Sequence, residues 1–184
     1  MTPRAWKTPA WIRADQPSDW RDPANQADYL VIAPAVLADA ARQLADYRAA
    51  SGFTTAVALL GDIHDEFNHG LASPGALQDF LAHAHDHWAL PPSFVVLVGN
   101  GSVDYRDHLG FGDNLMPPLL VPTPFGLFAA DNALVDFDGD ARPDIPIGRI
   151  PALSGAEMSD YLAKLMAYEQ GTGNWTSRVI MAAD

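Results

Sequence analysis

Cysteine is absent from all 184 residues of the chain. This absence excludes disulfide bonds, thiolate metal sites and a cysteine nucleophile within the chain. Basic residues are also scarce, since 11 Lys and Arg stand against 23 Asp and Glu and the formal net charge is -12. A nucleic-acid-binding surface needs a basic footprint, and an anionic membrane surface attracts basic segments. The composition therefore argues against both partners and is compatible with cation binding.

Long hydrophobic runs are missing as well. No apolar run approaches the ~20 residues that cross a bilayer, so no membrane span is predicted. The first residues, MTPRAWKTPAWIRADQ, lack the apolar centre of a secretory signal. Hydrophobic residues still make up 48% of the chain, which is enough for a sizeable core.

Short apolar runs alternate with helical patterns along the chain. Strands are predicted at residues 28–33, 53–60, 93–98 and 178–183, and a further one from Ile145 to Ile150. Helices are predicted at residues 36–50, 73–88 and 154–170. A strand, a helix and a second strand in this order are typical of a parallel sheet with right-handed crossovers. We predict an α/β fold in three layers, with a mostly parallel sheet of about four strands flanked by helices and a β-hairpin that carries an acidic loop.

Two parts are predicted along the chain. Residues 1–27 lack periodicity and are predicted to be an irregular lead-in or linker, although Trp6, Trp11 and Trp20 indicate that parts of it pack on a body. Residues 28–184 are predicted to be an α/β unit that is truncated before a further subdomain. The sequence ends at the carboxyl end of a predicted strand, where functional residues of open α/β sheets usually lie, and no helix follows that strand. An exposed apolar sheet edge would predict self-association.

The acidic loop is the strongest candidate site. Its sequence is VDFDGDARPDIPIGRI, and its four aspartates are Asp136, Asp138, Asp140 and Asp144. Calcium takes six to eight oxygen ligands from flexible loops, and alternating aspartates on a turned backbone supply them. The spacing differs from an EF-hand, which needs Gly at position 6 and Glu at position 12. The alternative is an acidic turn without metal, since Asp and Gly are ordinary turn residues.

Other polar clusters are weaker candidates. His83 and His87 have the i, i+4 spacing that can hold zinc, but histidine is also favoured in the last turn of a helix. The segment GDIHDEFNHG (residues 61–70) is predicted to be a connection that can include a helical turn. Its acidic residues are predicted to form a solvated turn or a contact with a partner subdomain. Ser102 lacks the G-x-S-x-G pattern of a nucleophile elbow. No catalytic residue is assigned in this chain.

In order, the pieces ADYLVIA, LADYRAASGF, DIHDEFNHG, FVVLVGNGSVDYR and DFDGDARPDIPIGRIPA resemble the gingipain family of cysteine peptidases in the caspase-like clan. A helix running to YEQ, followed by Trp175, extends the likeness. It covers about residues 25–184, and the acidic loop followed by IGRIP is its most specific part. The resemblance implies that this chain is the first, non-catalytic α/β subdomain of the family's catalytic domain.

The resemblance also implies a structural calcium ion near the acidic loop. Its ligands would be the carboxylates of Asp140 and Asp144 and the carbonyls of Phe137 and Arg142, with Asp136 and Asp138 as further candidates. Asn100 stands where the family often has an aspartate ligand.

The resemblance implies that the family's catalytic Cys and His lie downstream, in the second subdomain. This chain itself has neither a cysteine nor a histidine flanked by glycines. The implied partners are a downstream catalytic subdomain and, through it, a protein or peptide substrate, in a secreted or cell-surface protein. Two alternatives stay open: a calcium-stabilised binding or scaffold module, and part of a sortase-like transpeptidase on the same scaffold.

Overall fold

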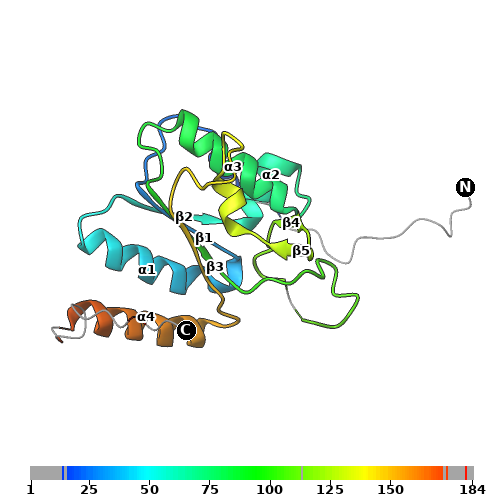
Figure 1. Cartoon of the computed structure of the whole chain (residues 1–184). Helices are drawn as coiled ribbons and strands as arrows, with labels where there is room; N and C mark the ends of the chain where they lie inside the picture. Colours follow the sequence, from blue (N-terminus) through cyan, green and yellow to red (C-terminus); the bar gives the residue numbers. More distant parts are fainter. Residues whose placement is uncertain (1–13, 15, 113, 172, 174–180, 182–184) are drawn as a thin grey trace, which may run out of the picture.

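A parallel four-stranded sheet forms the centre of the molecule (Figure 1). The computed structural model describes residues 14, 16–112, 114–171, 173 and 181. The strands lie in the order β2 (Thr55–Leu59), β1 (Tyr29–Ala33), β3 (Phe94–Val98) and β6 (Ile147–Ile150). All five residues of β1 are buried. A strand covered on both faces needs an apolar residue at every position, which explains the unbroken run YLVIA.

The two faces of the sheet pack against different helices. Leu30 and Ile32 of β1 face α2 (Leu60–Asn68) and α3 (Pro74–His87). Val31, from the alternate positions of the same strand, faces the side of α1 (Ala38–Ala50) and α4 (Gly155–Gln170). The structure is therefore a three-layer α/β fold, as predicted.

Most predicted elements are confirmed. The strands predicted at 28–33, 53–60 and 93–98 correspond to β1, β2 and β3, and the predicted helices correspond to α1, α3 and α4. Ser73 caps α3 as predicted, because its hydroxyl oxygen accepts a hydrogen bond from Gly75 N at 3.1 Å. A short 3-10 helix, η2 (Ala35–Leu37), precedes α1. The strand predicted at 178–183 lies outside the described residues, and β6 is the fourth strand of the sheet.

Two local predictions are wrong. The segment at residues 61–70, predicted as a connection with at most a helical turn, is mostly the nine-residue helix α2, whose Leu60, Ile63 and Phe67 turn toward the core. The acidic loop does not belong to a β-hairpin. The hairpin consists of β4 (Leu120–Thr123) and β5 (Gly126–Ala129), and the acidic loop follows later, between the 3-10 helix η3 (Asp131–Val135) and β6.

Residues 16–27, called the strap below, lie against α2 and α3. The carboxylate of Glu66 accepts hydrogen bonds from the Ser18 hydroxyl, from Trp20 N at 3.0 Å and from Arg21 N at 3.2 Å. The Trp20 ring stacks on Trp88, with ring centroids 5.9 Å apart. The predicted packing of Trp20 is thus confirmed, whereas Trp6 and Trp11 lie outside the described residues.

Candidate metal centre

The acidic loop, residues 136–144, is anchored at both ends. Before it, Val135 is fully buried, and after it Ile145 returns to the core. Asp144 N donates a hydrogen bond to Val135 O at 2.8 Å, which closes the base of the loop. The loop precedes β6 directly, so it lies at the amino end of that strand.

Backbone N–H groups inside the loop donate to its carboxylates. Both oxygens of Asp136 accept, Oδ1 from Gly139 N at 2.9 Å and Oδ2 from Ala141 N at 3.0 Å. Asp144 Oδ2 accepts from Phe137 N at 2.7 Å. Gly139 (φ 76°) and Ala141 (φ 66°) are left-handed, which turns the chain back on itself. These hydrogen bonds and the turned backbone therefore hold the carboxylates of Asp136 and Asp144 on the inner side of a closed turn.

Three carboxylates converge in this turn. Asp136, Asp138 and Asp144 each offer an oxygen, and these oxygens all lie within 4.8 Å of one another. Asp136 is half-buried and the other two are exposed. At that spacing, each pair of charges repels by about 1 kcal/mol in a water-like dielectric. Hard carboxylate oxygens with open access for water are the donor set that calcium prefers, so the residues present fit this ion.

The remaining predicted ligands are placed differently. Asp140 is not a member of the three-carboxylate group, and its Oδ1 accepts from Arg142 N at 2.8 Å. The Phe137 ring contacts His85 at the end of α3, with centroids 4.8 Å apart. The carbonyls of Phe137 and Arg142 stay predicted ligands.

Asn100 is not brought to the acidic loop. It follows β3, and Val98 of that strand pairs with Ile150 at the far end of β6. Since the two strands are parallel, Asn100 lies at the carboxyl edge of the sheet and the loop at the amino edge, separated by about 13 Å of strand length. The backbone of Asn100 bonds to Ala152 and Met116. Sequence order alone does not reveal that the two sites belong to opposite edges.

A second polar centre, which the sequence did not predict, lies at the carboxyl edge. Arg149 of β6 donates to both carboxylate oxygens of Asp131 at 2.7 Å, from Nε and Nη2. Its Nη1 donates to Met116 O at 2.6 Å and to Gly99 O at 3.2 Å. Gly101 lies beside this centre, where an added Cβ would stand 2.3 Å from Met116 O. Arg149 thus joins β6, η3 and the loop after β3.

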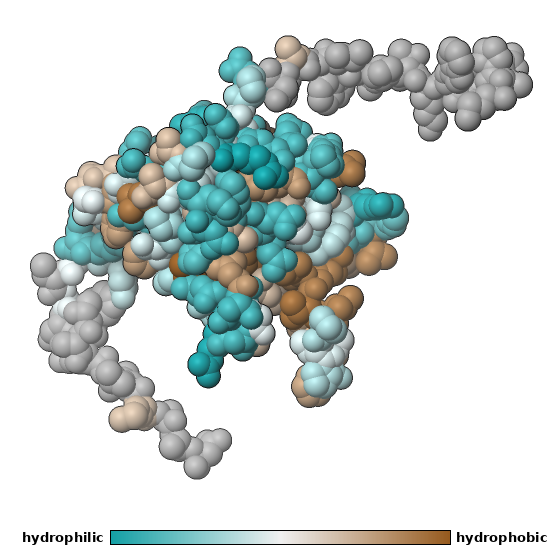
Figure 2. Space-filling model, turned by 90° about the horizontal axis from the view of Figure 1, so that it is seen from above, coloured by the Kyte–Doolittle hydropathy of each residue, from teal (hydrophilic) through white to brown (hydrophobic). Residues whose placement is uncertain are grey.

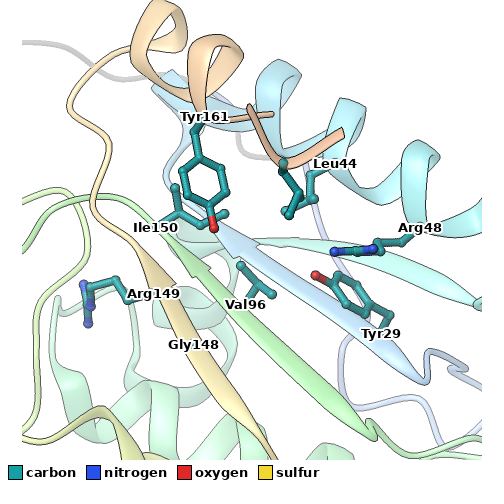
Figure 3. Close-up of a pocket in the computed structure, with 9 residues that line it drawn as sticks. Tyr29, Leu44, Arg48, Val96, Gly148, Arg149, Ile150 and Tyr161 are labelled. Carbon is teal, nitrogen blue, oxygen red and sulfur yellow. The ribbon is translucent and has the colours of Figure 1, made fainter. Parts of the chain in front are cut away.

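A cavity of about 130 Å³ lies between the sheet, α1 and α4, and Figure 3 shows the side chains that line it. Tyr161 of α4 lies above Ile150, and Tyr29 lies beside Arg48. Arg48 makes a two-pronged ion pair with Glu169, at 2.9 and 2.8 Å. That hydrogen bonding holds the pKa of the Glu169 carboxyl below its usual value. The two charged residues that line this cavity, Arg48 and Arg149, are paired with Glu169 and Asp131, so neither charge is left for a ligand.

The other candidate residues do not form a catalytic site among the described residues. His83 and His87 stack with parallel rings 4.5 Å apart, and His83 Nε2 lies 3.2 Å from Arg21 O, so the pair packs against the strap. Ser102 Oγ accepts from Asp104 N at 3.0 Å, which is a turn contact. His64 is buried beside Ser73, and burial lowers its pKa.

The fold is a caspase-like α/β unit, with a four-stranded parallel sheet between two layers of helices. The acidic turn before β6 is its candidate calcium site. The sequence matches the description "Peptidase family C25" over residues 22–184, and the chain belongs to that family, the gingipain family. The predicted family is thereby confirmed. A comparison with curated protein sequences gives no significant match.

Solved structures support the same fold. The chain is similar to dimeric latent PorU from Porphyromonas gingivalis, with a TM-score of 0.69 and 21% identity over 86% of this chain and 17% of that one. It is also similar to the complex of the pro- and mature domains of RgpB from the same organism, with a TM-score of 0.57 and 17% identity over 76% of this chain and 28% of that one. The chain is similar to a third structure, of a protease, with a TM-score of 0.54 and 21% identity over 77% of this chain and 28% of that one.

The chain therefore spans less than a third of each of these three structures. At such identities the likeness concerns the fold. No helix in the described part of the chain is long and apolar enough to cross a membrane.

Proposed function

We propose that this chain is the supporting, calcium-bound α/β unit of a gingipain-like cysteine endopeptidase whose Cys/His dyad lies outside these 184 residues. Membership of peptidase family C25 supports the peptidase assignment. The carboxylate oxygens of Asp136, Asp138 and Asp144 lie within 4.8 Å of one another. This convergence is the main support for a calcium ion that stabilises the unit. The protein as a whole would act on protein or peptide substrates at the cell surface or after secretion.

The acidic loop would contribute stiffness to this unit. The carboxylates of Asp136, Asp138 and Asp144 would hold the ion, which neutralises their mutual repulsion. The loop joins η3 to β6, and Phe137 contacts the end of α3, so fixing the loop would fix the amino edge of the sheet. Of the two carboxylates that the family resemblance implies, this ligand set keeps Asp144 and leaves out Asp140. Asp136 and Asp138 complete the set.

Chemistry at the peptide bond is assigned to the dyad. A thiolate would attack the carbonyl carbon, and a histidine would move the proton to the leaving amine. This chain has no cysteine, so it cannot supply the thiolate. The same absence favours the second candidate, a calcium-stabilised binding or scaffold module without enzymatic activity.

Thermal unfolding with calcium and with chelator tests the metal site. For a dissociation constant near 10 µM, about 1 mM calcium adds about 2.7 kcal/mol to the free energy of unfolding. For a chain of this size, that gain raises Tm by about 5–10 °C. Asp138→Asn should abolish the rise, whereas the neighbouring Asp140→Asn should keep it.

Two results would count against this site. Equal melting temperatures with calcium and chelator would show that no ion binds the folded chain. A loss of the calcium effect in Asp140→Asn, with Asp138→Asn unaffected, would restore the ligand set expected from the family.

A separate experiment tests the peptidase assignment. Reading the gene beyond Asp184 for about one domain length should reveal a Gly-His-Gly segment and a cysteine, each after a strand. A continuation with neither residue would leave the scaffold module as the function. The calcium result and this result are independent, so either proposal can fail alone.

A further inference from the structure

A long loop joins β3 to β4, and its described residues, 99–112 and 114–119, contain neither helix nor strand. Loops of this length in a compact domain usually carry a function. Residues 105–112 are all exposed. Figure 1 draws them as the green trace that runs away from the sheet after β3. On the same side, the right-hand edge of the body in Figure 2 shows hydrophilic teal and apolar brown atoms next to each other.

Residues 106–112 are held by hydrogen bonds that stay within the loop. One of them is donated by Leu109 N to the carboxylate of Asp104 at 2.5 Å. Just before this stretch, the Tyr105 hydroxyl donates to Pro118 O and ties down the base of the loop. Segments that are bonded only to themselves open with a small free energy. Residues 106–112 can therefore unfold locally while the sheet stays intact.

Arg106 is the basic residue of this exposed stretch. It is the only Lys or Arg in residues 49–141. Its guanidinium makes no hydrogen bond or ion pair with the described residues, so the side chain is free to enter a recognition pocket. A pocket that carries a carboxylate binds such a guanidinium through charge-assisted hydrogen bonds.

The other Lys and Arg in the described part of the chain are less available to a peptidase. Arg21 is bound to Glu66, through its amide at 3.2 Å and its guanidinium at 3.0 Å. Arg142 precedes Pro143, whose ring blocks the nitrogen of the bond to be cut. The remaining four lie in helices or in β6 and must be unfolded first, namely Arg42, Arg48, Arg149 and Lys164.

We propose that the Arg106–Asp107 peptide bond is a processing site, at which an endopeptidase that cuts after basic residues converts the folded chain into two fragments. The reaction is a hydrolysis that consumes one water molecule. The C–N bond breaks, the carbonyl carbon of Arg106 gains the water oxygen and becomes a carboxylate, and Asp107 leaves with a free amine. The site depends neither on the proposed calcium ion nor on the proposed Cys/His dyad.

The two fragments should remain one folded body. Strand β3 of the first fragment pairs with β6 of the second, from Val95 opposite Ile147 to Val98 opposite Ile150. On the face of α1 and α4, buried side chains from both fragments pack in one cluster. Cleavage therefore changes the connectivity of the chain without dismantling the sheet.

Limited digestion of the folded 184-residue chain with trypsin tests the proposal. Mass spectrometry should find the internal cut after Arg106 first, and the two fragments should co-elute in size-exclusion chromatography and separate in urea. The unfolding midpoint of the cut form should rise with protein concentration, because unfolding releases two chains. Arg106→Gln should remove the internal cut. Arg42→Gln, at an exposed arginine in α1, should leave it unchanged.

A second variant tests the local opening of the loop. Asp104→Asn weakens the hydrogen bond from Leu109 N, so the loop should open more often and be cut faster. Synthetic peptides of residues 100–112, with and without the substitution, correct for the preference of trypsin itself. We expect the folded chain to gain about threefold more in cutting rate than the peptide does.

Three results would overturn the proposal. The first is an internal cut whose rate follows global unfolding in urea, since the loop would then be protected in the folded chain. The second is a first internal cut after Arg21, Arg42 or Lys164. The third is a pair of fragments that separate or unfold without urea.

Discussion

Replacement of Arg149 by methionine should strongly destabilise the fold. The guanidinium makes four hydrogen bonds, two to Asp131 and one each to Met116 O and Gly99 O. The side chains of Arg149 and Asp131 are only 15% and 24% exposed. Breaking a buried pair by removing one partner costs about 3–5 kcal/mol, since the remaining charge is left uncompensated. After a discount for the partial exposure, we expect a loss of about 3 kcal/mol.

Urea unfolding measures this loss directly. A change of about 3 kcal/mol is a large share of the 5–15 kcal/mol typical of a domain, and it should lower Tm by about 6–12 °C. The slope m should stay constant, because the same surface is exposed on unfolding. Combining Arg149→Met with Asp131→Asn should cost less than the sum of the two single changes.

The ion pair between Arg42 and Asp39 provides the control. Its nitrogen and oxygen are also 2.7 Å apart, but the two side chains are 55% and 96% exposed. Arg42→Met should therefore change the free energy of unfolding by less than about 0.5 kcal/mol. If Arg149→Met costs no more than Arg42→Met, burial does not set the strength of these pairs and the reasoning is wrong.

Three further changes have defined outcomes. Glu66→Gln should lower the free energy of unfolding by about 1–2 kcal/mol in urea, because it weakens three hydrogen bonds to the strap, whereas the exposed Asp65→Asn should change it little. Burial lowers the pKa of His64 below its ordinary 6.5, so the unfolded chain binds more protons than the folded chain just below that pH. The free energy of unfolding should therefore fall as the pH drops below about 6.5. His64→Gln should flatten this part of the pH profile. Gly101→Ala should cost about 2 kcal/mol or more, since its Cβ would meet a carbonyl oxygen at 2.3 Å, while Gly148→Ala, with open space at its Cβ, should be neutral in the same assay.

Much of the fold follows from local sequence patterns. The buried strands β1 and β3 are continuous apolar runs between turn residues, and α3 begins at a serine followed by proline. The length of helix α2 was missed because the helix starts directly after β2 without a turn, and Gly61 and Asp62 resemble a loop. Its core-facing positions, Leu60, Ile63 and Phe67, carry a helical spacing that could have identified it.

The candidate site was predictable in part. The alternating aspartates indicate the loop, and three of the four do converge. Which three depends on the left-handed residues Gly139 and Ala141, and a non-glycine residue rarely adopts that conformation, so sequence gives no signal for Ala141. Asn100 was predicted as a calcium ligand from the family resemblance alone. The parallel direction of β3 and β6, which puts it at the opposite end of the strands from the loop, is not visible in the sequence. The Arg149 centre depends on contacts over 18 to 50 residues of sequence, which no local pattern encodes.

The strap has a consequence for the order in which the native protein opens. Its first half, residues 16–22, contacts residues 66–88 through one carboxylate and one stacked tryptophan pair. Its second half, residues 23–27, is bonded through the backbone to Ala89 and Leu90, and Ala27 is fully buried. Segments held by few buried contacts open with a lower free energy than core strands such as β1. The first half of the strap should therefore detach and return many times during the lifetime of one folded sheet, while residues 23–27 stay paired. Each detachment would uncover the indole of Trp88, so the rate of this local motion can be followed through tryptophan fluorescence while the rest of the fold stays intact.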